Sequence, residues 1–232
     1  MAFTGTNWKY NVENLDVFFA FIEEVEKSAP QLRSELSFCK HLLESKNFDK
    51  TYAGNSKNLY AQIFHKTISE GDFRYEIAFN IEKAEDLIKA KQYQPVLADI
   101  RNADTSGLYV NPLKLLNVDL QQPPIFINFV PQNALYVIDG VHRLCVARNK
   151  GICVLPIYLL NPTDFISCIE NKEIIDLYKI HSNLSAIVRA IAYKSPLSLC
   201  ENGGHYDFYQ MSSDKNAVEL QIQKFNSNNL KR

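Results

Sequence analysis

Five consecutive residues, Asp139-Gly-Val-His-Arg143, combine the groups that phosphate chemistry needs. They follow an apolar run that predicts a buried strand, and they open a stretch that predicts a helix. The first N–H groups of a helix have no partners within it, and the helix dipole adds partial positive charge there. Gly140 lets the backbone approach a phosphate closely, while His142 and Arg143 add side-chain donors. The residues Gly140, Val141, His142 and Arg143 therefore predict a phosphate or nucleotide site.

Asp139 has two interpretations at this position. Beside a phosphate its carboxylate would repel a bare anion, but it would serve if it bound Mg²⁺ or accepted a proton from a hydroxyl nucleophile. Alternatively, it caps the turn by accepting backbone N–H bonds, as Asp does in many Asp-Gly turns. Arg143 also needs an anion nearby, because a cation in the first turn opposes the helix dipole. Either a bound phosphate or a neighbouring Asp would supply that anion.

The run resembles the signature of the ParB/sulfiredoxin superfamily, whose members share a small mixed α/β fold with a turn that holds nucleotide phosphates. The likeness extends from Gln94 to Leu160. Segments 124–130 and 134–138 resemble the two strands before the turn, and segment 151–160 resembles the strand after the helix. The turn itself is most similar to those of free-serine kinases and of DndB-type regulators of DNA modification. The resemblance implies ATP or another nucleoside triphosphate, with Mg²⁺, as the ligand.

Two departures from the superfamily pattern narrow the function. Sulfiredoxin has a nucleophilic Cys where this chain has Val141, so sulfinic acid repair by that route is not expected. Partition proteins of the ParB type carry a later Glu-Asn-x-Gln-Arg-like box, which Ile169-Glu-Asn-Lys-Glu173 does not match. DNA partitioning is therefore not expected either.

Three polar residues form a second rank of site candidates: Asp99, Arg101 and Asp104. In relatives, the polar loop that contains them and the helix that follows lie near the nucleotide or the substrate. Asp, Asn and Ser also favour loops for their own backbone hydrogen bonds, so ordinary turn chemistry is the favoured account of these residues.

The remaining chemistry-bearing residues show no pattern of a metal or nucleophile site. Neither a Gly-x-Ser-x-Gly elbow nor a Walker-type loop is present in the sequence. The other histidines have no short-spaced partners for a metal, although His205 lies in a glycine-rich loop from which it could reach the site. The five cysteines are odd in number and have no Cys-x-x-Cys pair, so we expect reduced, buried thiols. They are Cys39, Cys145, Cys153, Cys168 and Cys200.

Composition favours a packed globular protein without a strong electrostatic preference. The formal net charge of −1 gives no general attraction to nucleic acid or to an anionic membrane, and 46% of the residues are hydrophobic. The sequence contains no apolar run of roughly 20 residues, so no membrane helix is predicted. Because the N-terminus lacks a signal-peptide pattern, we expect a cytoplasmic protein, and a secreted effector with an unconventional signal fits the same N-terminus.

Periodicity predicts an α+β (mixed α/β) fold in three regions. Residues 1–92 are expected to be helical, with apolar residues at helical spacing in segments 15–25, 32–43, 59–64 and 73–88. Glycine-containing segments at 54–56 and 71–72 are expected to separate these helices. Residues 93–160 are expected to form the ParB/sulfiredoxin-like core, with a first strand at 93–100 and a short helix at 111–116. Residues 161–232 are expected to pack mainly as helices on that core, beginning at Asn161-Pro162 and continuing in two helices up to Ile191.

The leading hypothesis is a nucleotide-binding protein with phosphoryl chemistry at the Asp139–Arg143 turn. It would be an ATPase or a phosphotransferase that acts on a small-molecule or protein acceptor, with Asp139 and His142 as catalytic residues and Mg²⁺ held through Asp139. One alternative is a DNA-binding regulator or nuclease of the ParB-like or DndB-like type. Another is a non-catalytic module that binds a protein partner.

Overall fold

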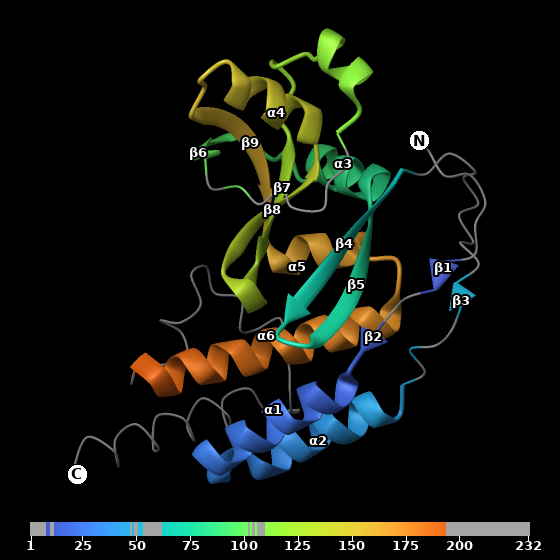
Figure 1. Ribbon diagram of the computed structural model, residues 1–232, viewed down its shortest axis with the longest axis vertical. Coiled ribbons are helices and arrows are strands. Elements are labelled where there is room, and N and C mark those ends of the chain that lie inside the picture. Colours follow the sequence, from blue (N-terminus) through green and yellow to red (C-terminus); the bar gives the residue numbers. More distant parts are fainter. Residues whose placement is uncertain are drawn as a thin grey trace. The chain divides into compact units, whose positions relative to one another are not determined.

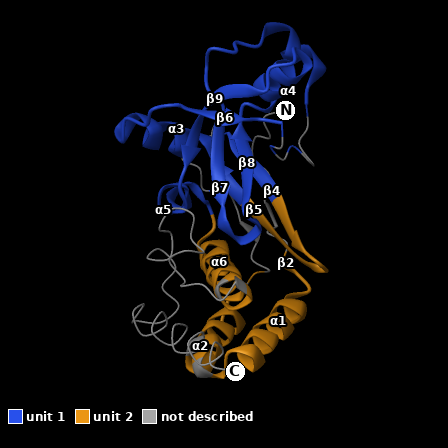
Figure 2. Ribbon diagram, turned by 90° about the vertical axis from the view of Figure 1, so that its left-hand side faces the viewer, with its two compact units in different colours: residues 1–4, 56–66, 78–170 blue, residues 5–55, 67–77, 171–232 orange. Residues whose placement is uncertain are grey.

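The computed structural model describes residues 8–9, 12–46, 48, 51–52, 62–101, 103, 105 and 110–193. The chain divides into two compact units, shown in different colours in Figure 2. Unit 1 comprises residues 1–4, 56–66 and 78–170, and unit 2 comprises residues 5–55, 67–77 and 171–232. The candidate turn therefore belongs to unit 1.

Unit 1 is built on a four-stranded sheet in the order β6-β9-β7-β8. Its strands are β6 (Val96–Asp99), β7 (Ile125–Phe129), β8 (Ala134–Asp139) and β9 (Val154–Leu160). β7 pairs antiparallel with β8 and parallel with β9, while β9 pairs antiparallel with β6. All four strands lie where the apolar runs of the sequence predict them, and β6 is an edge strand, as expected for a segment that follows Pro95.

Two helices of unit 1, α3 and η2, begin at an asparagine that caps them, whereas Asn161 makes no side-chain cap at the start of α5. Asn80 accepts a hydrogen bond from the Lys83 N–H at 3.0 Å and so caps α3, and Asn111 accepts from the Leu113 N–H at 3.0 Å and caps η2. Pro112 occupies the first position of η2, which confirms the predicted short helix as a 3₁₀ helix. The helical elements are α3 (Ile81–Ala90), η2 (Pro112–Asn117), η3 (Val130–Gln132), α4 (Val141–Asn149), α5 (Pro162–Phe165) and η4 (Ile166–Cys168).

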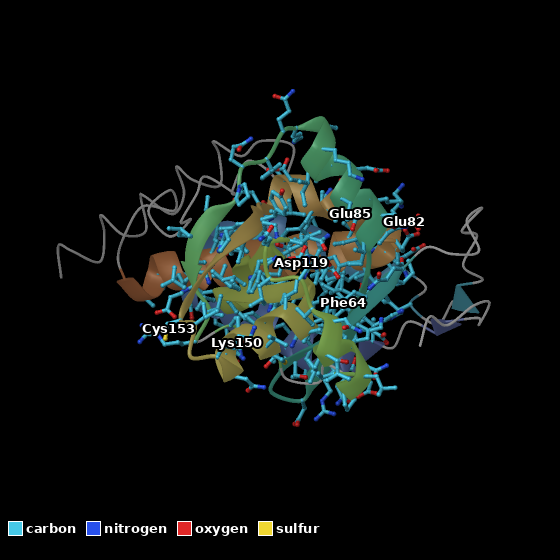
Figure 3. The ribbon with its side chains drawn as sticks, turned by 90° about the horizontal axis from the view of Figure 1, so that it is seen from above. Phe64, Glu82, Glu85, Asp119, Lys150 and Cys153 are labelled. Carbon is cyan, nitrogen blue, oxygen red and sulfur yellow. The ribbon has the colours of Figure 1, made fainter. Side chains whose placement is uncertain are left out.

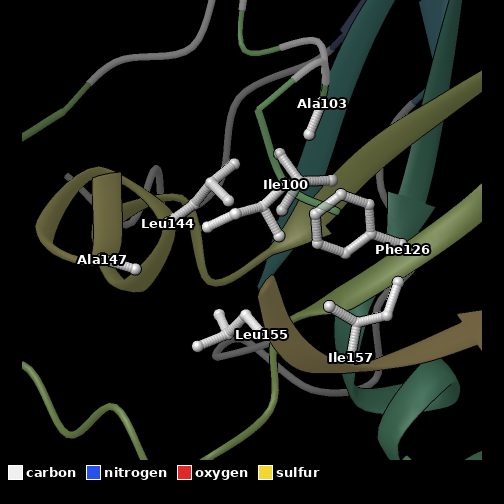
Figure 4. Packing of buried hydrophobic residues seen from close by; sticks show 8 residues of the cluster. Ile100, Ala103, Phe126, Leu144, Ala147, Leu155 and Ile157 are labelled. Atoms are coloured by element: carbon white, nitrogen blue, oxygen red, sulfur yellow. The ribbon is translucent and has the colours of Figure 1, made fainter. Parts of the chain in front are cut away.

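A hydrophobic cluster holds α4 on the sheet (Figure 4). Leu144 and Ala147 of α4 are fully buried in it. From the sheet they meet the buried side chains of Phe126, Val137, Leu155 and Ile157. Burying a leucine side chain contributes about 1.5–3 kcal/mol, so this cluster fixes the position of α4 and, with it, of the turn that precedes α4.

The expected helix around residues 63–80 is wrong. β4 (Ile63–Glu70) and β5 (Phe73–Asn80) form a hairpin instead, and the predicted break at 71–72 is its two-residue turn. Phe73, Tyr75 and Ile77 are buried, which is the alternation of a strand, and Gly71 has the positive φ of 58° that such a turn favours. The spacing of the aromatic and β-branched residues in this segment fits both a helix and a strand. Pairing of the two strands determines that the segment forms a hairpin. Segments 54–56 and 59–61 lie outside the described residues.

Unit 2 is mainly helical (Figure 1). Its helices are α1 (Leu15–Ser28), η1 (Pro30–Leu32), α2 (Arg33–Glu44) and α6 (Lys172–Tyr193). β2 (Val12–Glu13) pairs with β5, and β1 (Trp8–Lys9) pairs with β3 (Thr51–Tyr52). The helices predicted near residues 15–25 and 32–43 are confirmed.

The two helices predicted between residues 174 and 191 are a single helix, α6. The polar triplet His181, Ser182 and Asn183 separates the two apolar stretches in the sequence, yet all three residues are buried. The helix continues through them, and aromatic rings of unit 2 enclose the imidazole of His181. Phe18, Phe73 and Tyr75 pack around the His181 ring with centroids 5.6–6.3 Å away.

Taken as a whole, the structure is α+β, as the sequence predicts. Among the described residues, none of the helices combines the length and the hydrophobicity that crossing a membrane requires.

The buried imidazole of His181 should make unfolding sensitive to pH. Burial lowers the pKa of His181 from 6.5 to about 3, with a smaller contribution from Arg189. As the pH falls, the imidazole is therefore protonated in the unfolded chain before it is protonated in the folded chain. The contribution of the neutral ring to the free energy of unfolding is complete above pH 6.5 and is lost as the pH falls towards 3. We expect this group to reduce the free energy of unfolding by about 1 kcal/mol per pH unit below 6.5. Urea unfolding at several pH values measures it.

His181→Gln should flatten this pH dependence. His41→Gln is the matched control, because the His41 side chain is 85% exposed. An unchanged pH dependence in His181→Gln would contradict the prediction.

Candidate functional site

The turn between β8 and α4 strongly favours a glycine at position 140. Gly140 has φ 90° and ψ 23°, in the left-handed region. A Cβ on this residue would lie 2.6 Å from the Pro124 Cβ and 2.7–2.8 Å from two guanidinium nitrogens of Arg143. The glycine is therefore favoured by its backbone conformation and by its neighbours together.

The start of α4 presents backbone donors in the way that the sequence predicts. The first hydrogen bond of the helix runs from the Leu144 N–H to the Gly140 carbonyl at 3.0 Å. The N–H groups of Val141, His142 and Arg143 precede that bond, and Gly140 has no side chain to cap them. This end of α4 thus carries the partial positive charge that favours an anion.

Arg143 is a buried cation whose partners belong to the protein. Its Nη2 forms an ion pair with Asp139 Oδ2, and the two side chains are only 11% and 20% exposed. Its Nη1 donates to the carbonyl oxygens of Gln122 at 3.1 Å and Pro123 at 3.3 Å. The sequence leaves two possible anionic partners for Arg143, a bound phosphate and a neighbouring Asp. In the structure the partner is Asp139. The guanidinium ties the turn to the segment that leads into β7.

His142 is held as a neutral ring. Its Nε2 lies 3.0 Å from the Asn111 backbone N–H, which can only donate, so Nε2 accepts and the proton of the neutral ring is on Nδ1. Burial lowers the pKa of His142; Lys114 and Arg143 lower it further, while Asp139 opposes them. His142 therefore offers a phosphate one neutral N–H donor rather than a positive charge.

The second-rank residues Asp99 and Arg101 lie away from this turn. They form their own ion pair, with Arg101 Nε 2.9 Å from both carboxylate oxygens, and this pairing lowers the pKa of Asp99 to about 2. They precede a loop that is held at the opposite end of α4, where Arg148 donates to the carbonyls of Ile100 and Ala103, both at 2.6 Å. Nine helical residues separate the two ends by about 13 Å.

Asp104 and His205 lie outside the described residues. The structure therefore brings together Asp139, Gly140, Val141, His142 and Arg143 but leaves Asp99 and Arg101 elsewhere.

The end of α4 that adjoins Asp99 and Arg101 also carries an exposed thiol. Lys150 and Cys153 follow α4 and are labelled together in Figure 3. The pKa of Arg101 is raised, chiefly by Asp99 and to a smaller extent by Cys153. The described cysteines are free thiols, of which Cys39 and Cys168 are buried; the expectation of a buried set is wrong for Cys153.

Two contributors to the site were not predicted: Asn111 and Lys114. The sequence marks Asn111-Pro112 as a helix start, but nothing in it indicates that the Asn111 amide meets His142. Lys114 is an ordinary exposed lysine of η2, and only the contact between η2 and α4 brings its charge near the turn. In the part of the chain that the structure describes, no cluster of three or more His, Cys, Asp or Glu residues could hold a metal ion.

Comparisons with protein-family models, with curated proteins and with solved structures found no match to this chain. The turn, its flanking strands and the side chains around it are therefore the basis on which function can be argued.

Replacing Gly140 tests the geometry of the turn. Gly140→Ala should lower the free energy of unfolding by about 2–5 kcal/mol, because the left-handed conformation and the clash with Pro124 and Arg143 both contribute. Gly151→Ala is the matched control: it also has a positive φ, of 72°, but nothing lies within 4 Å of its Cβ position. It should lose about 1–2 kcal/mol. Equal losses in chemical denaturation would show that the close approach at Gly140 is absent.

The protonation of His142 can be observed directly. Nitrogen NMR of the imidazole should show an unprotonated Nε2 and a proton on Nδ1 at pH 7, because the Asn111 amide occupies Nε2. The ring should titrate below pH 6.5, with burial as the main cause. The spectrum of His142→Gln identifies the signal. A neutral ring with its proton on Nε2 would contradict the hydrogen bond to Asn111.

Proposed function

We propose that this protein binds the phosphates of a nucleotide at the start of α4 and carries out phosphoryl chemistry there. The chemistry would be ATP hydrolysis or transfer to a small-molecule or protein acceptor. The observation that carries the proposal is the sequence of strand, glycine turn and helix start, with three backbone N–H groups ahead of the first helical hydrogen bond. The same arrangement supports membership of the ParB/sulfiredoxin superfamily, which we propose with it.

The charges around the turn suit an anion. Asp139 would repel a phosphate if it were alone, but its ion pair with Arg143 cancels that charge locally. His142 is neutral and can donate from Nδ1, while Lys114 is exposed and close enough to lower the pKa of His142. The positive potential at the turn thus comes from the helix end and Lys114.

Magnesium fits this site only in partnership with the nucleotide. Asp139 Oδ2 is occupied by Arg143, which leaves Oδ1 as the carboxylate oxygen that a metal ion or an acceptor hydroxyl would meet. Mg²⁺ commonly binds to one or two carboxylates, with phosphate oxygens and water as its other ligands. When bound, it would neutralise charge on the phosphates. Asp139 would position it, and the backbone at the start of α4 would hold the phosphate oxygens.

Titration calorimetry with ATP, ADP and CTP in the presence of Mg²⁺ tests the proposal. We expect Lys114→Gln to weaken ATP binding about 2–5-fold, the effect of one exposed charge near the phosphates. Lys150→Gln is the matched control: Lys150 is equally an exposed lysine but lies at the other end of α4, so its loss should change little. The same samples are assayed for phosphate release.

Absence of binding by all three nucleotides would refute the proposal. Equal weakening by Lys114→Gln and Lys150→Gln would refute the location of the phosphates at the start of α4.

A further inference from the structure

Two leucines of η2 are exposed to an unusual degree for apolar side chains. Leu113 is 75% exposed and Leu116 is 79% exposed, whereas Leu115 between them is half-buried. In a 3₁₀ helix, residues three apart lie on the same side. Leu113 and Leu116 therefore form one apolar surface, here named the leucine ridge, while Leu115 faces the protein.

The leucine ridge is fixed to the candidate phosphate site. The Asn111 N–H donates to His142 Nε2 at 3.0 Å, and Asn111 Oδ1 accepts from the Leu113 N–H at 3.0 Å. Consequently, the ridge begins two residues after a direct contact with the second residue of α4. Lys114 belongs to the same short helix, and its charge acts on His142.

We propose that the leucine ridge binds the base of a purine nucleotide whose phosphates lie at the start of α4. This inference rests on the proposed function. A nucleotide is anionic at one end and presents flat, apolar faces at the other. The turn and Lys114 match the anionic end, and the ridge is an exposed apolar surface on the element attached to that turn.

The spacing of the two leucines favours a purine over a pyrimidine. One turn of a 3₁₀ helix separates them by about 6 Å along its axis. A bicyclic base can cover both side chains, whereas a single ring covers mainly one. An apolar surface makes no hydrogen bonds that would distinguish one purine from another. The protein should therefore select bases by ring size rather than by their pattern of hydrogen-bonding groups.

Another exposed leucine provides a matched control. Leu97 of β6 is 77% exposed and belongs to the strand that leads to Asp99 and Arg101, at the other end of α4. It should have no part in binding a nucleotide at the start of α4.

The experiment measures the affinities of the full chain for ATP, CTP and inorganic tripolyphosphate, each with Mg²⁺. The double variant Leu113→Ser/Leu116→Ser should bind ATP about 10-fold more weakly, because the base loses its apolar contact. Its affinity for tripolyphosphate should be unchanged. The wild-type protein should prefer ATP to CTP, and Leu97→Ser should alter neither affinity. Thermal unfolding of each variant verifies the fold.

The outcomes separate this inference from the proposed function. If the wild-type protein binds tripolyphosphate and ATP equally well, the phosphate site stands and the base site at the leucine ridge is refuted. Unchanged ATP affinity in the double variant also refutes it, and a simultaneous change of oligomeric state would assign the ridge to contact between copies of the chain. If the wild-type protein binds neither ligand, both proposals fail.

Discussion

One buried guanidinium, that of Arg143, holds the candidate site together. A buried charge is tolerated only when it is paired and hydrogen-bonded, and Arg143 meets both conditions through Asp139 and the carbonyls of Gln122 and Pro123. These contacts join the end of β8, the segment before β7 and the first turn of α4. Removal of either charge would leave the other uncompensated, which typically costs 3–5 kcal/mol. The shape of the turn therefore depends on this pair.

The pair also sets the electrostatic character of the turn. Because Arg143 is matched by Asp139, and His142 is kept neutral mainly by burial and accepts a hydrogen bond from the Asn111 amide, the strongly polar side chains around Gly140 contribute little net charge. The backbone donors of α4 and Lys114 remain to attract an anion. A phosphate bound there as proposed would meet fixed dipoles, which need no reorganisation when a ligand arrives.

Sequence patterns predict the parts of this site that are local. The strand, the glycine and the helix follow from an apolar run and from Gly140, and the cap of η2 follows from Asn111-Pro112. Contacts between distant segments could not be predicted, because no local pattern encodes the meeting of Asn111 with His142 or of Arg148 with Ile100. The hairpin at 63–80 differs from the helix that its apolar spacing predicts, because its residues fit the periods of both a helix and a strand and only strand pairing decides between them.

Contacts at the two ends of α4 fix the chain on either side of residues 104–110. At one end Arg148 donates to the carbonyls of Ile100 and Ala103, and at the other His142 accepts from the Asn111 amide. The entropic cost of holding the two ends of such a connection together rises only logarithmically with its length. Doubling its length would cost only about 0.6 kcal/mol in closure entropy. Insertions between positions 103 and 111 should therefore cost little stability, because the contacts that hold α4 lie at the two ends of the connection.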